Sequence, residues 1–277
     1  MNLNMPFHSF NVELPIDCIV ESKNYIVLCG YLYANVERNG CVHFLDKNSL
    51  EIVHTVKTSG TLHAFYKDNR IYLANSEDIS VLEENELIYK VMTKALNTYV
   101  YVDEYVYVSD EKGNITVYDL NLNLFKTISV TNEPIWVVKY FNSNLYFGNE
   151  KGECFKYNLE TNELQQIGSK RLGIIDILVD SDNIIVTSYD DNVEIFDFNT
   201  LSMKKKIIKS GSLWKILKYN EVYFCASIYD GVKIFDSNFN LLKQIKVETI
   251  CYGIWISGYK LLWADFYEKK INWTTLK

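Results

Sequence analysis

A repeat of about forty residues constrains this chain more than any other feature. Strand-like stretches end in seven similar pairs, each an apolar residue followed by a mostly polar one, and the second members stand 36 to 39 residues apart. A period of this length, filled with short strands and turns, is typical of a β-propeller. The pairs are Leu45-Asp46, Leu82-Glu83, Tyr118-Asp119, Tyr157-Asn158, Phe196-Asp197, Phe235-Asp236 and Trp273-Thr274. We therefore predict an all-β fold with seven blades in a single domain covering 1–277, because each blade buries its faces against its neighbours.

The clearest repeat lies at residues 188–204. A polar turn at 188–191 precedes an alternating stretch at 193–196, and a second turn follows. Alternation of apolar and polar residues with a period of two indicates a half-buried strand. The stretch ends in Phe196-Asp197, at the place where a WD repeat carries its Trp-Asp pair. The repeat is therefore of the WD type.

The last repeat is incomplete. We expect blades at about 17–57, 61–91, 97–130, 134–167, 173–208, 212–246 and 249–277. The seventh has room for only three strands, whereas residues 8–14 form an isolated strand-like stretch. We predict that 8–14 pairs with 271–275, which closes the ring and removes an exposed sheet edge. In the first blade, 33–40 is expected to be a long connection between the second and third strands.

Charge and composition exclude several classes of partner. The formal net charge is −7 and the pI is about 5.2, which disfavours nucleic acid because phosphate binding requires a basic face. No apolar run reaches the length of a membrane span, and residues 1–10 lack the pattern of a signal peptide. The six Cys form no C-x-x-C pair and are interpreted as free thiols of a reducing compartment. We expect a cytoplasmic monomer without cofactor or metal.

Propeller connectivity predicts which residues share a face. The innermost strand of each blade begins on one rim, and the turn between the second and third strands returns to that rim. The expected rim is aromatic and acidic. Its members include Asp17, His63, Glu133, Trp136, Asp176, Trp214 and Tyr252 from the innermost strands, and 149–152, 188–191, 227–231 and 265–268 from the turns.

Several segments, in chain order, resemble the diphthine methyl esterase family of WD-repeat proteins in diphthamide biosynthesis, formerly called diphthine methyltransferases. The segment 211–218 is similar to the family's Gly-Val-Trp-Arg-x-Lys motif, with Lys215 in place of Arg. The turn at 225–232 is similar to Ala-Cys-Met-His-x-Gly-Phe, with Tyr229 in place of His. Further matches are at 187–197, 252–255 and 265–273, where Asp265 and Glu268 replace Ser and Asp.

This resemblance implies an esterase activity. The family hydrolyses the methyl ester of methylated diphthine on translation elongation factor 2, giving diphthine and methanol. The substrate is a modified His with a trimethylammonium group next to the ester. Aromatic rings and carboxylates favour a quaternary ammonium, and the expected rim contains both. Elongation factor 2 is then the expected protein partner.

Candidate residues follow from this rim. The catalytic candidates are Asp190, Asp230 and His63, as bases that activate water. For the two Asp the alternative is that they hold their turns, and for His63 that it is an ordinary polar rim residue. The expected substrate-binding residues are Asp17, Trp136, Tyr189, Trp214, Lys215, Tyr252, Asp265 and Tyr267. For Trp214 and Trp136, packing around the channel is the competing interpretation.

A second class of function remains open. A propeller can also be a non-catalytic scaffold that binds protein partners on its rim, and a fold alone does not distinguish the two. No Gly-x-Ser-x-Gly motif for a serine hydrolase is present. Loss of methanol release after changes at the rim would favour the enzyme, whereas altered binding without chemistry would favour the scaffold.

Overall fold

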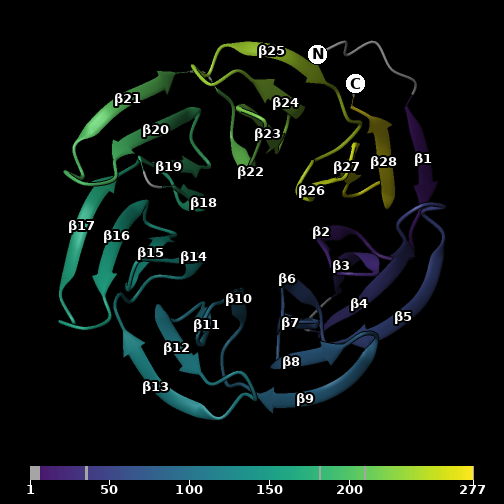
Figure 1. Cartoon of the computed structure of the whole chain (residues 1–277), viewed down its shortest axis with the longest axis horizontal. Coiled ribbons are helices and arrows are strands. Elements are labelled where there is room, and N and C mark those ends of the chain that lie inside the picture. Colours follow the sequence, from purple (N-terminus) through teal and green to yellow (C-terminus); the bar gives the residue numbers. More distant parts are fainter. Residues whose placement is uncertain (1–6, 35–36, 181, 209, 277) are drawn as a thin grey trace.

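Seven four-stranded antiparallel sheets surround a central axis (Figure 1). The computed structural model describes residues 7–34, 37–180, 182–208 and 210–276, and every regular element in these ranges is a strand. The innermost strands of the sheets face the axis, and the outermost strands form the circumference. The predicted seven-bladed propeller is confirmed.

The first four blades follow one another along the chain. Blade 1 consists of β2 (Ile16–Glu21), β3 (Tyr25–Ala34), β4 (Glu37–Asp46) and β5 (Ile52–Thr58). Blade 2 consists of β6 (Thr61–Lys67), β7 (Arg70–Asn75), β8 (Asp78–Glu83) and β9 (Glu86–Met92). Blade 3 consists of β10 (Asn97–Val102), β11 (Val106–Asp110), β12 (Asn114–Tyr118) and β13 (Leu124–Ser129). Blade 4 consists of β14 (Ile135–Phe141), β15 (Asn144–Asn149), β16 (Glu153–Asn158) and β17 (Leu164–Ser169).

The last three blades complete the ring. Blade 5 consists of β18 (Ile174–Val179), β19 (Asn183–Ser188), β20 (Asn192–Asp197) and β21 (Met203–Ile208). Blade 6 consists of β22 (Leu213–Tyr219), β23 (Val222–Ser227), β24 (Gly231–Phe235) and β25 (Leu241–Ile245). Blade 7 consists of β26 (Ile254–Ser257), β27 (Lys260–Asp265) and β28 (Lys270–Thr275), with β1 (His8–Asn11) as its fourth strand.

The N-terminal strand closes the ring. β1 pairs antiparallel with β28, with His8 opposite Trp273 and Phe10 opposite Ile271. The His8 ring stacks on Trp273 with their centroids 4.4 Å apart, and Phe10 packs against the core around Ile271. The prediction that 8–14 completes blade 7 is therefore confirmed for residues 8–11.

The hydrophobic core lies between successive blades. Tyr72 and Val81 of blade 2, for example, are buried against Val100 and Val108 of blade 3. In blade 2, the second and third strands, β7 and β8, are buried on both faces, whereas the outer strand β9 consists of exposed and half-buried residues. Burial against both neighbours explains the long apolar runs of the inner strands, and it makes the ring one unit.

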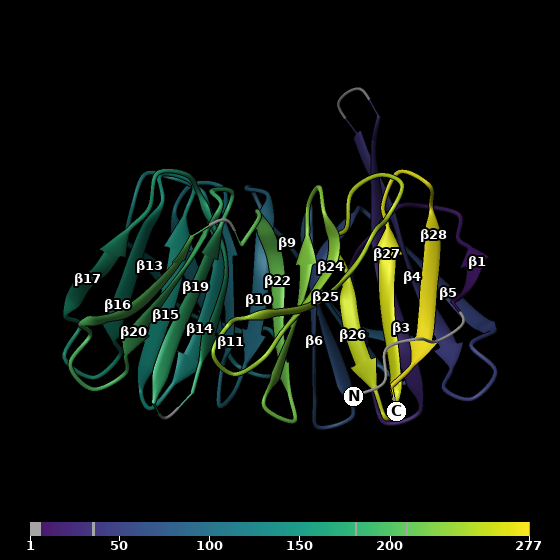
Figure 2. The same ribbon diagram turned by 90° about the horizontal axis from the view of Figure 1, so that it is seen from above.

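The connection expected at 33–40 is largely strand. β3 and β4 continue their pairing to Tyr33 opposite Arg38, so the blade 1 hairpin has ten-residue strands. Figure 2 shows this hairpin rising beyond the neighbouring turns on its side of the ring. Tyr33 is 58% exposed. The connection is thus longer than its neighbours, as expected, but β3 and β4 stay paired along most of it.

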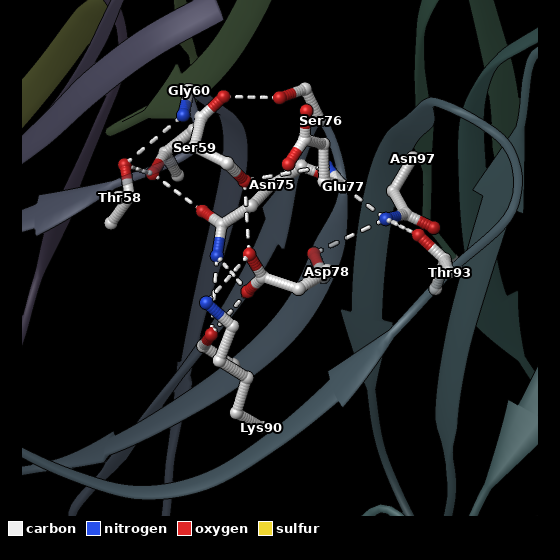
Figure 3. Close-up of polar contacts among 12 residues, drawn as sticks. Thr58, Ser59, Gly60, Asn75, Ser76, Glu77, Asp78, Lys90, Thr93 and Asn97 are labelled. Atoms are coloured by element: carbon white, nitrogen blue, oxygen red, sulfur yellow. Dashed lines mark hydrogen bonds and ion pairs between the residues drawn. The ribbon is translucent and has the colours of Figure 1, made fainter.

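A polar network joins the first three blades on the same rim (Figure 3). The buried Asp78 carboxylate accepts hydrogen bonds from Asn75 Nδ2 at 2.7 Å and from Ser59 Oγ at 2.9 Å, and it pairs with Lys90 at 3.3 Å. Asn97 Nδ2 of blade 3 donates to the Asn75 carbonyl at 2.7 Å. Because each buried polar group has partners, these contacts fix the turns between blades.

The cysteines and the apolar segments complete the description of the fold. All six Cys are buried and form no disulfide. No helix long and apolar enough to cross a membrane occurs in the part of the chain that the structure describes.

A cavity at the mouth of the central channel as the candidate functional site

β-Bulges at the start of the innermost strands build the site. In each of blades 1 to 6 the pairing with the second strand skips one residue, as between Ile16 and Cys18 and between Leu213 and Lys215. A bulge places two residues of one strand against one of its partner and redirects the side chains. The skipped residues are Asp17, Leu62, Thr98, Trp136, Ile175 and Trp214.

All six skipped residues line one cavity. Its volume is about 260 Å³, below the range of about 300–1,000 Å³ usual for drug-sized ligands. The bulge explains how consecutive residues such as Trp214 and Lys215 both reach the cavity. The other lining residues are Cys18, Ile19, Tyr31, Arg38, His63, Tyr99, Tyr189, Tyr252, Gly253 and Ile254. The cavity therefore admits one small group at the centre of the ring.

Aromatic rings and one carboxylate form one side of this cavity. Trp214 stacks on Tyr252 with their ring centroids 4.1 Å apart, and Tyr189 meets Trp214 edge-on at 5.7 Å. The Trp214 indole donates a hydrogen bond to Asp17 Oδ1 at 3.1 Å. At Gly253 a Cβ atom would lie 3.3 Å from the Asp17 carbonyl oxygen, so glycine allows blade 7 to approach blade 1 closely.

Burial makes Asp17 an unusual carboxyl group. Asp17 is only 8% exposed, and the loss of hydration that follows from this burial raises the pKa of its carboxyl group to about 7. Hydrogen bonds from Trp214 and Tyr31, and the charges of Lys215 and Arg38, oppose the shift without cancelling it. Near neutral pH the Asp17 carboxyl group is therefore partly protonated and partly ionised.

Two lysines and one buried carboxylate form the floor. Asp176 is 1% exposed, and its two oxygens lie 3.4 Å from Lys139 Nζ and 3.7 Å from Lys215 Nζ. Both ammonium groups contact the Tyr99 hydroxyl, Lys215 at 3.2 Å. Burial alone lowers the pKa of Lys215, but Asp176 and Tyr99 outweigh it and raise that pKa above its usual value. With two cations against one anion, the floor carries one unbalanced positive charge.

His63 lies beside this floor in its neutral form. Its ring stacks on Tyr99 with the centroids 3.5 Å apart, and Nδ1 lies 3.1 Å from the Val100 carbonyl oxygen. Burial, together with the charges of Lys215 and Lys139, holds the pKa of His63 well below its usual range. A carbonyl oxygen can only accept a hydrogen bond, so His63 Nδ1 carries the proton and donates the hydrogen bond. Nε2 then has no proton and can act as an acceptor.

The blade 1 hairpin covers one edge of the cavity. Arg38 lies over the rings of Tyr31 and Tyr33, 5.3 and 5.2 Å from their centroids. Among the residues that the structure describes, none accepts a hydrogen bond from its buried Nη1. Such an atom is a candidate donor to a ligand at the cavity mouth.

The residues expected from sequence divide between this cavity and its surroundings. Those that line it are Asp17, His63, Trp136, Tyr189, Trp214, Lys215 and Tyr252. Asp190 and Asp230 do not line it. Asp190 accepts from the Asn192 amide at 2.9 Å and pairs with the buried Lys170 at 3.2 Å. Asp230 pairs with Lys233 at 2.6 Å. Both carboxylates thus hold the turns of their own blades.

Asp265 and Tyr267 also lie outside the cavity. Asp265 is 3% exposed and accepts hydrogen bonds from the Glu248 and Thr249 amides at 2.8 and 3.1 Å. It borders a second, larger cavity of about 660 Å³ next to β25, β27 and β28, which is remote from the channel mouth. Tyr267 is 67% exposed on the rim and packs edge-on against Phe266.

Several residues that line the cavity or its floor were not expected from the sequence, and four of them bear on its chemistry. Tyr31 and Arg38 come from the extended hairpin, and Tyr99 and Lys139 come from blades with no conspicuous motif. A signal was present for Tyr99, which occupies the same position in its repeat as His63 and Lys215. Lys139 lies in the middle of its strand, and its contacts with Asp176 and the Tyr99 hydroxyl bring it to the site.

Acid–base and binding chemistry are both available here. Among the residues that the structure describes, no group of three or more His, Cys, Asp or Glu is placed to hold a metal ion. The ionisable groups instead form two opposed sets, an aromatic and acidic wall and a basic floor. Such an arrangement suits a small ligand with a cationic and an anionic or electronegative end.

Comparisons with known proteins give the fold alone. No family model and no curated protein sequence matches the chain. Among solved structures it is similar to the computationally designed Ika8 protein, with a TM-score of 0.72 at 9% sequence identity, over 96% of this chain and 98% of that one. At this identity the likeness supports the propeller architecture and carries no information about function.

Proposed function

We propose that this protein hydrolyses the methyl ester of methylated diphthine on translation elongation factor 2, releasing diphthine and methanol. One observation carries the proposal: the cavity combines stacked aromatic rings, a carboxyl group that titrates near neutrality and a lysine within one small volume. A substrate with a trimethylammonium group next to an ester matches this arrangement, because the ammonium suits the aromatic rings and the ester oxygen suits the lysine. The resemblance of 211–218 and 252–255 to the diphthine methyl esterase family supports the same reaction.

Recognition of the ammonium is assigned to the rings of Trp214, Tyr252 and Tyr189. Quaternary ammonium groups are attracted to aromatic faces, and Trp is the strongest of these. The ester carbonyl is then directed toward the floor, where Lys215 Nζ donates to its oxygen. The charge of Lys215 is secured by Asp176 and by the Tyr99 hydroxyl.

Asp17 is assigned the role of base. Its pKa of about 7 suits proton transfer at neutral pH, because a base titrating near the working pH combines availability with strength. The carboxylate takes a proton from water as the oxygen bonds to the ester carbon. Lys215 stabilises the oxyanion. The bond to the methoxy oxygen then breaks, Asp17 returns the proton, and methanol leaves while the new carboxyl group loses its proton to solvent.

His63 is the competing base. Its Nε2 is free to accept a proton, but burial and the neighbouring ammonium groups make it weakly basic. We therefore expect His63→Gln to retain most of the activity and Asp17→Asn to lose it.

The rim around the cavity suits a substrate carried by a protein. Tyr229 is 78% exposed, Tyr267 67% and Tyr33 58%. Tyr229 and Tyr267 lie in hairpin turns and Tyr33 lies near the end of β3, all on the rim where the innermost strands begin. Exposed aromatic residues are enriched at protein interfaces. The same exposure favours the second candidate, a scaffold that binds a protein on this rim without chemistry.

The test is methanol release from elongation factor 2 that carries methylated diphthine, with the accompanying loss of mass. The full chain is compared with Asp17→Asn, His63→Gln and the surface control Asp103→Asn. Release by the wild type and the control, lost only with Asp17→Asn, is the expected result. No release by the folded wild type would overturn the esterase and leave the scaffold. Release unaffected by Asp17→Asn would overturn the assignment of the base.

A further inference from the structure

The basic floor has no role in holding the ammonium, and it is incompletely neutralised. Lys139 and Lys215 share the single carboxylate of Asp176, and Lys215 also lines the cavity. The other groups near Lys215 include the Tyr99 hydroxyl, the neutral His63, the Cys18 thiol and Asp17, whose pKa of about 7 leaves it only partly ionised at neutral pH. One positive charge is therefore left for an anionic ligand group.

The opposite wall has the reverse character. Asp17 and the faces of Trp214 and Tyr252 attract a cation, and the Trp214 indole already bonds to Asp17. Trp214 and Lys215 are consecutive residues. The site for a cation beside Trp214 and the site for an anion beside Lys215 are therefore close together. The bulge between Leu213 and Lys215 is what turns both side chains toward the cavity.

From these two walls we propose that the cavity binds free betaines, small molecules in which a quaternary ammonium stands next to a carboxylate. The inference rests on the proposed function, since the hydrolysed ester leaves this same pair of groups, and it adds that the product end is itself a ligand. The ammonium lies against Trp214 and Tyr252, and the carboxylate accepts hydrogen bonds from Lys215. Free betaines then compete with the protein substrate.

Glycine betaine is the smallest probe with both groups next to each other. Choline has the quaternary ammonium without the carboxylate, and acetate has the carboxylate alone. A hydrogen bond to a charged group changes affinity by about ten- to a hundredfold. We expect glycine betaine to bind the full chain at least about tenfold more tightly than choline, with acetate weaker still.

The measurement is isothermal titration calorimetry with all three probes on the wild type and on Lys215→Met. We expect this substitution to weaken glycine betaine binding by about ten- to a hundredfold and to leave choline binding unchanged. Lys218→Met is the matched control, because Lys218 is on the same strand but pairs with Asp180 and Glu221 at the surface. Should Lys215→Met fail to fold, Lys215→Arg keeps the charge and is expected to keep the preference for betaine.

Four results would each overturn the inference. Two concern the wild type: choline binds as tightly as glycine betaine, or glycine betaine does not bind. Two concern the variants: the betaine preference survives Lys215→Met, or it is lost in a folded Lys215→Arg. The methanol assay separates this inference from the proposed function. Hydrolysis without betaine preference removes only the inference, and betaine preference without hydrolysis removes only the esterase.

Discussion

Asp17→Asn is expected to stabilise the fold while it removes activity. A buried carboxyl group whose pKa is raised on folding is harder to ionise in the native protein than in the unfolded chain. Asn has nearly the same shape and cannot ionise, and its side-chain oxygen can still accept the hydrogen bond from Trp214. The substitution therefore isolates the free energy of placing this charge in the cavity.

The magnitude follows from the two pKa values. The pKa of Asp17 is about 7 in the native protein and 3.8 in the unfolded reference. This difference of about three units, at 1.36 kcal/mol each, corresponds to about 4 kcal/mol. Below pH 4 the carboxyl is protonated in both states and the charge has no effect. As the pH rises from 4 to 7, the unfolded state loses its proton first, so the wild type loses stability relative to Asp17→Asn, and the difference is constant above pH 7.

Urea denaturation between pH 4 and pH 8.5 measures this difference directly. The free energies of unfolding of wild type and Asp17→Asn should diverge with rising pH, with the variant the more stable by about 4 kcal/mol at pH 8. Asp103→Asn, at a surface pair with Lys67, should stay close to the wild-type curve throughout. Parallel curves for wild type and Asp17→Asn would refute the reasoning, because they would mean that Asp17 ionises in the native protein as it does in water.

Three further expectations concern the site and the ring. Trp214→Ala should lower the rate of methanol release by about thirtyfold, since a desolvated cation–π contact contributes about 2 kcal/mol. Lys170→Met should lower the free energy of unfolding by about 3–5 kcal/mol in urea, because it leaves the buried Asp190 carboxylate without its ammonium partner. Lys206→Met, which removes the 45% exposed partner of Glu194, should change it by less than about 1 kcal/mol. Phe10→Ala should cost about 2 kcal/mol by weakening the closing strand, whereas the 65% exposed Leu124→Ala should be nearly neutral, and equal effects would argue against closure by β1.

Asp17 is proposed to lower the stability of the fold and to serve catalysis, and its surroundings differ from those of the other buried aspartates. Asp78, Asp190 and Asp265 are also buried. Asp78 and Asp190 accept hydrogen bonds within their turns, and Asp265 accepts them from the backbone amides of Glu248 and Thr249. Asp17 has the Trp214 indole as its hydrogen-bond partner across the ring and keeps a raised pKa. Groups with such shifts concentrate at functional sites, because catalysis needs a carboxyl that exchanges its proton near neutrality.

The repeat determined the architecture from sequence alone. Pairs such as Phe196-Asp197 recur at nearly constant spacing, and each blade needs neighbours to bury its faces, so seven repeats give seven blades. The missing strand of the last blade likewise predicted that the N-terminal segment pairs with β28. These features recur at regular intervals along the chain, so they can be recognised in the sequence without the structure.

The site depended on contacts that no local pattern encodes. Asp17 and Trp214 are 197 residues apart in the chain, yet one accepts the hydrogen bond of the other, and Tyr99 meets Lys215 across the ring. Which residue of each innermost strand turns inward was decided by the bulges, which depend on register with the next strand. The raised pKa of Asp17 arises from desolvation in a cavity whose lining residues come from several blades of the closed ring. Sequence therefore determined the ring and the chemical character of its rim, whereas only the closed tertiary structure decided which acidic residue faces the cavity.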